Sequence, residues 1–206
     1  MRNIYVIPHT EATHHTERLV GGWYDSGLTP HGVRDAVRIA HALAARLDDD
    51  GSVDVRSSDL ARARQTAQPI GDALGVAVGI DRDLREQSYG TADGTPVGST
   101  PYEPPPLDER RMHHRSGAGA ETRFEWATRT YAALDRILEN GHDHTVVVTH
   151  GGTATYLIAA WLEIPIEATR RAKFITAPGS ITHLREHDVS WDREVVTLND
   201  IGHLRE

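Results

Sequence analysis

The chain has 206 residues, a formal net charge of −8 at pH 7 and no cysteine. The acidic charge argues against a nucleic-acid backbone or an anionic membrane surface as a partner. The absence of cysteine excludes disulfides, thiolate catalysis and cysteine-ligated zinc. No basic leader and no long apolar run is present, so we expect a cytoplasmic protein that folds as a single domain over residues 1–206.

Short apolar runs alternate with helical patterns in the first 80 residues. A helix is predicted over residues 29–47, because Thr29 can cap it, Pro30 suits its first turn, and Val33 and Val37 begin an apolar stripe. A second helix is predicted over residues 57–75, with Ser and Asp caps at its start and Gly75 at its end. The strands predicted here are Ile4–Ile7, Val53–Val55 and Val76–Ile80.

The second half begins with a segment of different character. Residues 88–120 are rich in glycine, proline and charge, which indicates a functional lid or a disordered insert. A helical pattern returns over Glu121–Asn140, and Thr145–Thr149 is a β-branched run typical of the centre of a sheet. Further strands are predicted at Lys173–Ile175, Ser180–Arg185 and Glu194–Leu198. This alternation predicts an α/β fold, a three-layer sandwich with helices on both faces of a mostly parallel sheet.

Two histidines follow predicted strands directly. His9 ends "YVIPH" and His150 ends "VVVTH", so both are expected at the carboxyl edge of the sheet, where ligands gather in such folds. Gly151 opens the helix after His150, and free amide groups at a helix start suit an anion. Arg62 follows the predicted strand Val53–Val55, and Glu86 follows the predicted strand Val76–Ile80. This collection suits phosphoryl transfer, in which an imidazole attacks phosphorus, cations hold the oxygens and a carboxylic acid protonates the leaving group.

Five blocks in this order resemble the histidine phosphatase superfamily, which has the phosphoglycerate-mutase-like fold. The blocks are "PHTE" at 8–11, "GLTPHG" at 27–32, "SSDLARARQTA" at 57–67, "LREQSYGTADG" at 84–94 and "VVVTHGG" at 146–152. The resemblance implies that His9 accepts the phosphoryl group, that Arg62 and His150 hold the phosphate, and that Glu86 donates the proton. It also implies that residues 88–120 form a cap facing the substrate.

The same resemblance implies a small phosphorylated metabolite as substrate. We assign His15, Thr10, Gly151 and Trp23 to the substrate-binding set, because His15 stands where the family often has a polar phosphate contact and Trp23 could stack on a ring. No cofactor and no metal is expected. Adjacent residues of a strand point to opposite faces, so His14 and His15 are not expected to share a metal.

The chain departs from the family at two positions of the first block. The family's arginine before the nucleophile is Pro8 here, and the following glycine is Thr10. Removing a charge aimed at a phosphoryl transition state can cost about 10³-fold in rate. The candidate replacements are His14, His15, Arg82, Arg85, Arg110, Arg111 and Arg115.

Pro8 therefore leaves other functions open. The pocket could have lost phosphatase activity and bind a ligand or a partner, or His9 and Glu86 could act as acid and base on a substrate without phosphate. A phosphomutase is ranked below a phosphatase, because a mutase must hold its phosphoenzyme tightly. A homodimer is also open, with the apolar strands of the tail as the place where two copies would pair.

Overall fold

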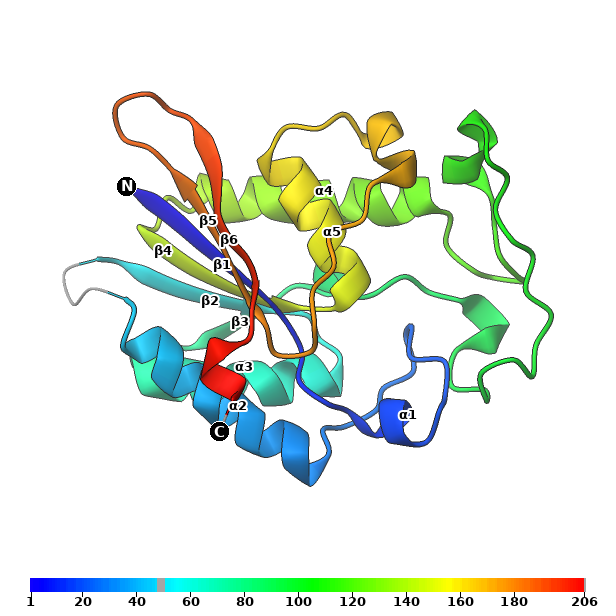
Figure 1. Ribbon diagram of the computed structural model, residues 1–206, viewed down its shortest axis with the longest axis horizontal. Helices are drawn as coiled ribbons and strands as arrows, with labels where there is room; N and C mark the ends of the chain where they lie inside the picture. Colours follow the sequence, from blue (N-terminus) through cyan, green and yellow to red (C-terminus); the bar gives the residue numbers. More distant parts are fainter. Residues whose placement is uncertain (48–50, 206) are drawn as a thin grey trace.

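A six-stranded sheet forms the centre of the computed structural model, which describes residues 1–47 and 51–205. The strand order is β3-β2-β4-β1-β5-β6, as Figure 1 shows. The pairs β3·β2, β2·β4 and β4·β1 are parallel, while β1·β5 and β5·β6 are antiparallel, so the predicted mostly parallel sheet is confirmed. The strands are β1 (Arg2–Pro8), β2 (Val53–Ser57), β3 (Val78–Ile80), β4 (His144–Thr149), β5 (Ile181–Glu186) and β6 (Arg193–Asp200).

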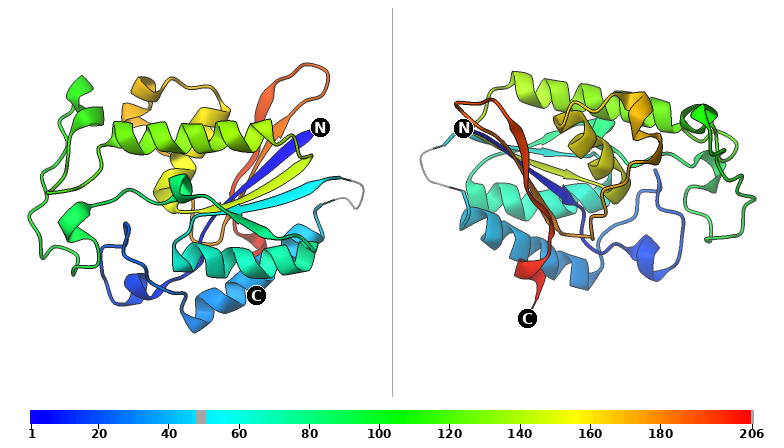
Figure 2. Two further views of the ribbon diagram at one scale, coloured as in Figure 1. Left: turned by 180° about the vertical axis from the view of Figure 1, so that it is seen from behind. Right: turned by 45° about the horizontal axis from the view of Figure 1, so that its top comes forward.

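Helices cover both faces of the sheet, which confirms the three-layer architecture (Figure 2). The side chains of β1 alternate between the layers: Tyr5 and Ile7 pack in the core beside α2 and α3, and Ile4 and Val6 pack in the core beside α4 and α5. The helices are α1 (Thr13–Thr16), α2 (Pro30–Ala44), α3 (Ala61–Leu74), α4 (Arg123–Glu139) and α5 (Gly151–Trp161). None of the described helices is long and apolar enough to cross a membrane.

The ends of the first long helices agree only in part with the expected caps. Thr29 accepts the N–H of Gly32 at the start of α2, and Gly75 ends α3 in the left-handed region with φ +68°. The predicted Ser and Asp caps of α3 are wrong, because the helix begins only at Ala61. The N–H of Ala61 donates to the carboxylate of Asp25, 36 residues earlier, at 2.6 Å.

The strand predicted at Lys173–Ile175 is also wrong. These residues form an extended loop between a 3₁₀ turn, Ile166–Arg171, and β5. The backbone N–H and C=O of Phe174 both bond to the hydroxyl of Thr155 on α5, at 3.3 and 3.2 Å. The segment therefore satisfies its backbone on a helix side chain, where a strand would need a neighbour in the sheet.

Pro8 ends β1 without removing a hydrogen bond from the sheet. The N–H of Asn3 donates to the carbonyl of Asp143, just before β4, and the N–H of His9 donates to the carbonyl of Thr149 in β4. The backbone N–H groups of odd-numbered residues in β1 therefore face β4. The nitrogen of Pro8 faces β5, and the pairing of β1 with β5 stops at Val6. A proline is therefore tolerated at this position.

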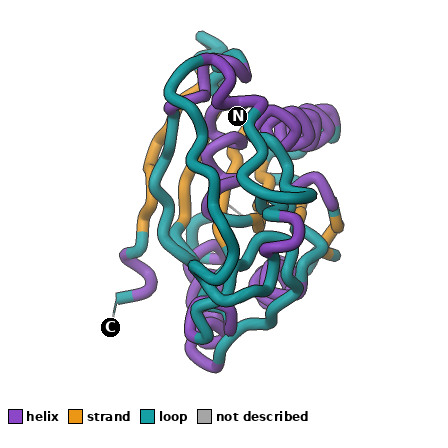
Figure 3. The backbone as a smooth tube through the Cα atoms, turned by 90° about the vertical axis from the view of Figure 1, so that its right-hand side faces the viewer, coloured by secondary structure: helices purple, strands orange, loops and turns teal. Residues whose placement is uncertain are grey.

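Residues 88–120 lie beyond the carboxyl edge of the sheet, at one end of the molecule (Figure 1). Seen onto that end, loops lie in front of the strands (Figure 3). A bridge between Tyr89 and Ala120 joins the two ends of this segment, which contains two 3₁₀ turns, Gly90–Ala92 and Glu109–His113. At the other side, β6 is an edge strand with Val196 and Leu198 exposed. The homodimer remains a prediction with this edge as its place.

Candidate active site

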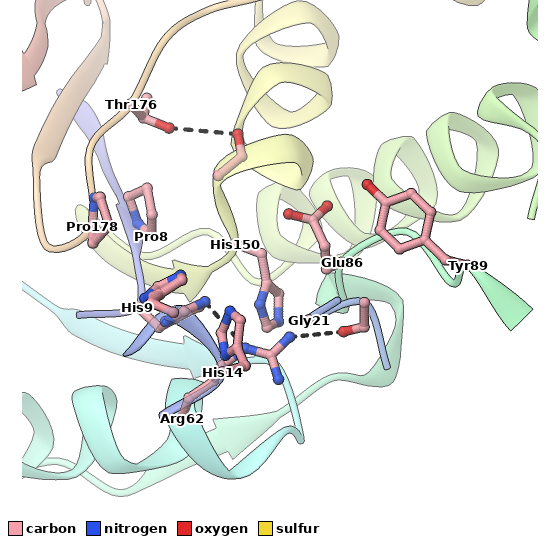
Figure 4. A pocket seen from close by; sticks show the side chains of 13 residues that line it. Pro8, His9, His14, Gly21, Arg62, Glu86, Tyr89, His150, Thr176 and Pro178 are labelled. Atoms are coloured by element: carbon pink, nitrogen blue, oxygen red, sulfur yellow. Dashed lines mark hydrogen bonds between the residues drawn. The ribbon is translucent and has the colours of Figure 1, made fainter. Parts of the chain in front are cut away.

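A cavity of about 270 Å³ opens at the carboxyl ends of β1 and β4 (Figure 4). Pro8 and Thr149 are register partners, so the next residues, His9 and His150, emerge side by side with ring centres 5.1 Å apart. Six of the eight site residues predicted from the sequence line this cavity: His9, His15, Arg62, Glu86, His150 and Gly151. The sheet edge therefore gathers residues from four separate parts of the chain.

His9 is buried, and both nitrogens of its ring are hydrogen-bonded. Its Nδ1 lies 2.7 Å from the carbonyl oxygen of Thr10. A carbonyl only accepts, so Nδ1 carries the proton and Nε2 carries the lone pair. Arg62 Nε donates to that Nε2 at 3.1 Å. Burial first, and then the Arg62 charge, hold the pKa of His9 well below its usual value, which keeps the ring neutral at neutral pH.

Arg62 is almost completely buried and holds a loop as well as the pocket. Its Nη1 and Nη2 donate to the carbonyl oxygens of Tyr24 and Gly22, each at 2.7 Å. With the bond to His9, three of the five guanidinium N–H groups are used, and two remain for an anion. Desolvation lowers the pKa of Arg62 to about 10, so the group stays charged at neutral pH.

His150 and His15 present further donors to the cavity. His150 Nε2 lies 2.9 Å from Ser58 Oγ, and its buried Nδ1 has no hydrogen-bond partner within residues 1–47 and 51–205. His15 Nδ1 accepts the backbone N–H of Ala12 at 3.2 Å, so the proton of neutral His15 is on Nε2. Burial lowers the pKa of both rings. The Nε2–H of neutral His15 can hydrogen-bond a phosphoryl oxygen, and His150 Nδ1 can do so in the tautomer whose Nε2 accepts the hydroxyl of Ser58.

Glu86 follows a 3₁₀ turn after β3 and is held by two backbone amides. Its Oε2 accepts the N–H of Gly152 at 2.9 Å, and its Oε1 accepts the N–H of Gln87 at 3.0 Å. Burial raises the pKa of the carboxyl group above its usual value and outweighs these bonds. A Cβ on Gly152 would lie 2.5 Å from Glu86 Oε1 and 2.3 Å from the ring of Trp126, so only glycine fits there.

Thr10 and Trp23 do not line the cavity. The hydroxyl of Thr10 donates to the carbonyl of Gly32 at 2.8 Å, away from the cavity. Trp23 Nε1 donates to the carbonyl of Glu86 at 2.8 Å, and the guanidinium of Arg85 lies 4.8 Å from its ring centre. Both residues support the walls of the site.

The arginines considered as replacements for the family arginine are engaged elsewhere. Arg85 binds Asp59 with two hydrogen bonds of 2.7 Å, and Arg82 lies over the ring of Trp23. Arg110, Arg111 and Arg115 bind Asp108, backbone carbonyls and Glu125, respectively. In the described part of the chain, Arg62 is the one arginine or lysine that lines the cavity. Pro8, His14 and His15 line the same cavity.

His14 joins the site through a short helix that sequence reasoning treated as a strand. In α1 the rings of His14 and His15 are 4.0 Å apart, so the argument from opposite strand faces is wrong. His14 Nδ1 lies 2.7 Å from Ser26 Oγ, and burial lowers the pKa of His14 to about 3. One nitrogen from each of His9, His14 and His15 lies within 4.8 Å of the others, an arrangement that could hold a divalent metal.

Three more lining residues came from loops without a sequence signal. Tyr89, Thr176 and Pro178 complete the wall on two sides of the cavity (Figure 4). Tyr89 belongs to the cap segment, whereas Thr176 and Pro178 belong to the loop that was predicted in part as a strand. The fold and cavity thus define an α/β protein with hydrogen-bond donors, one guanidinium and one carboxyl group at the carboxyl edge of its sheet.

Comparison with known proteins identifies this class more closely. A sequence model of the histidine phosphatase superfamily (branch 1) matches residues 4–200. The chain is 32% identical over 177 residues to a protein named "Probable phosphoglycerate mutase GpmB" from Yersinia pestis, covering 84% of this chain and 80% of that protein. The protein belongs to the histidine phosphatase superfamily, and the resemblance inferred from its motifs is confirmed.

Solved structures show the same fold. A mycobacterial glucosyl-3-phosphoglycerate phosphatase is 25% identical with a TM-score of 0.76, over 96% of this chain and 98% of that chain. The α-ribazole phosphatase from Shigella flexneri is 20% identical with a TM-score of 0.77, over 96% of each chain. These matches support the three-layer fold over nearly the whole length.

Proposed function

We propose that the protein is a phosphatase that hydrolyses a small phosphorylated metabolite through a phosphohistidine on His9, without a metal ion. The observation that carries this proposal is the state of His9, which lines the cavity, is neutral and carries its proton on Nδ1 through the bond to Thr10, so that Nε2 keeps the lone pair. The names of two structural neighbours, both phosphatases, and family membership support it.

In this mechanism the lone pair of His9 Nε2 forms a bond to phosphorus while the bond from phosphorus to the ester oxygen breaks. Arg62 releases Nε2 and, with its two unused N–H groups, holds the phosphoryl oxygens. His15 Nε2 adds a neutral donor, and His150 Nδ1 adds another when Ser58 donates its hydroxyl proton to His150 Nε2. Glu86, whose raised pKa favours the protonated form, gives its proton to the leaving oxygen. The resulting carboxylate then takes a proton from the water that cleaves the phosphohistidine.

The test measures turnover and the covalent intermediate together. Hydrolysis of p-nitrophenyl phosphate and a base-stable, acid-labile phosphoenzyme are followed for the natural protein, for His9→Ala and for His41→Ala. His41 is exposed on α2 and serves as the matched control. We expect His9→Ala to lose both signals and His41→Ala to keep both. Equal rates for the natural protein and His9→Ala would remove His9 from the chemistry.

The name of the Yersinia relative makes phosphoryl transfer between two hydroxyls the second candidate. Incubation with 3-phosphoglycerate separates the two reactions, because a mutase forms 2-phosphoglycerate and a phosphatase releases inorganic phosphate. We expect inorganic phosphate, since one guanidinium holds the phosphoenzyme less tightly than two.

A further inference from the structure

A second cavity of about 400 Å³ adjoins the catalytic one. The two share Glu86, Tyr89, Gly151 and Thr176, so they lie side by side with Glu86 at their border. In Figure 4, Glu86 and Tyr89 lie on the same side of the first cavity. A leaving oxygen that receives its proton from Glu86 must lie at this border, and the rest of the leaving group then extends into the second cavity.

The larger cavity of the cap does not compete for this role. It has a volume of about 830 Å³ and is lined by residues of 19–21, 89–103 and 116–118, but not by Glu86. It meets the catalytic cavity only at Gly21 and Tyr89. A group bound there would not bring its ester oxygen to the proton donor.

One wall of the second cavity is a packed aromatic surface. Trp126 of α4 and Tyr156 of α5 are both buried, with ring centres 4.8 Å apart in an edge-to-face arrangement. Trp126 is fixed by a 2.9 Å bond from Nε1 to Thr153, and Phe174 lines the same cavity from the loop. Such a wall favours a flat apolar body in the ligand.

The second cavity also carries positive charge. Arg123, at the start of α4, and Lys173 both line it, and Arg123 hydrogen-bonds to the hydroxyl of Tyr156. Neither cation is a member of any ion pair found among residues 1–47 and 51–205. The chain as a whole carries −8, and Lys173 is its only lysine. Two unpaired cations beside a proton donor are the complement of an anionic group on the leaving group.

We propose that the second cavity binds the alcohol half of the substrate, and that this half is a flat, carboxylate-bearing group held by Arg123 and Lys173. The inference rests on the proposed function, because it takes Glu86 as the proton donor. It names a substrate class: phosphomonoesters of hydroxy acids whose body packs on Trp126 and Tyr156.

The first experiment compares kcat/KM for 3-carboxyphenyl phosphate and 3-carbamoylphenyl phosphate, which differ in charge but hardly in shape. We expect a preference for the carboxylate of at least about tenfold, the factor typical of a charge-assisted hydrogen bond. The preference should fall toward one in Arg123→Gln and in Lys173→Gln, and remain partly in Arg123→Lys. The control is Arg110→Gln, since Arg110 is exposed in the cap and binds Asp108. A natural protein without the preference, or variants that keep it in full, would overturn the proposal.

The second experiment needs no catalysis and separates this inference from the proposed function. Lys173 and the N-terminal amine are the only primary amines that acetic anhydride can label on the chain. In His9→Ala, 3-carboxyphenyl phosphate should slow the acetylation of Lys173 and leave that of the N-terminus unchanged. Protection of Lys173, combined with a natural protein that has no phosphatase activity, would support the subsite and refute the proposed function. Equal labelling of Lys173 with and without the probe would refute the subsite.

Discussion

Mild acid should destabilise the protein through the buried histidines of the pocket. Burial lowers the pKa of His14 to about 3 and holds the pKa values of His9 and His150 well below 6.5. In the unfolded chain the same imidazoles titrate at about 6.5. As the pH falls through that value, the unfolded state binds protons that the folded state does not, so the free energy of unfolding decreases.

The magnitude follows from the unfolded pKa. At about pH 5.5, protonation stabilises the unfolded state by about 1.4 kcal/mol for each such histidine, and at about pH 7.5 by less than about 0.1 kcal/mol. His9, His14 and His150 together therefore lower the free energy of unfolding by about 4 kcal/mol between these pH values. That is a large share of the roughly 5–15 kcal/mol that stabilises a typical domain.

Urea unfolding at both pH values tests this reasoning in the natural protein, in His14→Asn and in His41→Asn. The quantity compared is the difference in unfolding free energy between the two pH values, in which a pH-independent loss of stability in His14→Asn cancels. Glu86, whose raised pKa acts in the opposite direction, contributes to this difference in each protein, so its effect cancels when the natural protein and the variants are compared. We expect the difference to shrink by about 1.3 kcal/mol in His14→Asn and to stay unchanged in His41→Asn, which alters an exposed residue. A full difference in His14→Asn would mean that the folded pocket accepts the proton.

Three further changes probe the site. Pro8→Arg should raise kcat/KM for phosphomonoesters by roughly 10- to 150-fold, the effect of one charge-assisted hydrogen bond, because position 8 lines the cavity; a rate equal to or below that of the natural protein would contradict this. EDTA should leave phosphatase activity unchanged, whereas added Zn²⁺ should inhibit by binding His9, His14 and His15; the inhibition constant should rise at least about tenfold in His14→Asn, and an unchanged constant would exclude that site. Gly152→Ala should cost about 1–3 kcal/mol of stability in urea unfolding and most of kcat, because its Cβ overlaps Trp126 and Glu86; a variant as stable and active as the natural protein would refute this close approach.

The main features of the fold could be predicted because they depend on local patterns. The β-branched run of β4 and the apolar run of β1 predict central strands, and a parallel pair places the residues after them at one edge. The same local patterns are enough to bring His9, His150 and Arg62 together at that edge. The apolar stripe predicted for α2 is confirmed in part: its members Ile39 and Leu43 form the buried face, whereas Val33 and Val37 are exposed.

Features that depend on distant contacts could not be predicted. The start of α3 is capped by Asp25, and no local pattern indicates a partner 36 residues away. His14 reaches the pocket only because the chain turns into a four-residue helix, which is too short to leave a periodic signal. The wall formed by Thr176 and Pro178 comes from a loop whose path is set by a bond to Thr155.

Pro8 is the residue that connects the fold to the chemistry of the site. Its ring costs the sheet nothing, because its nitrogen faces a side of β1 where pairing has ended. Pro8 stands where the family has the fixed positive charge of an arginine. His14 and His15 line the same cavity, and the pKa values of both are lowered. An incoming phosphoryl dianion raises the pKa of every imidazole that it touches, so proton uptake by this pair can supply part of the missing charge. The pocket would then bind its anion more tightly as the pH falls, whereas a pocket with two guanidinium groups would not depend on such uptake.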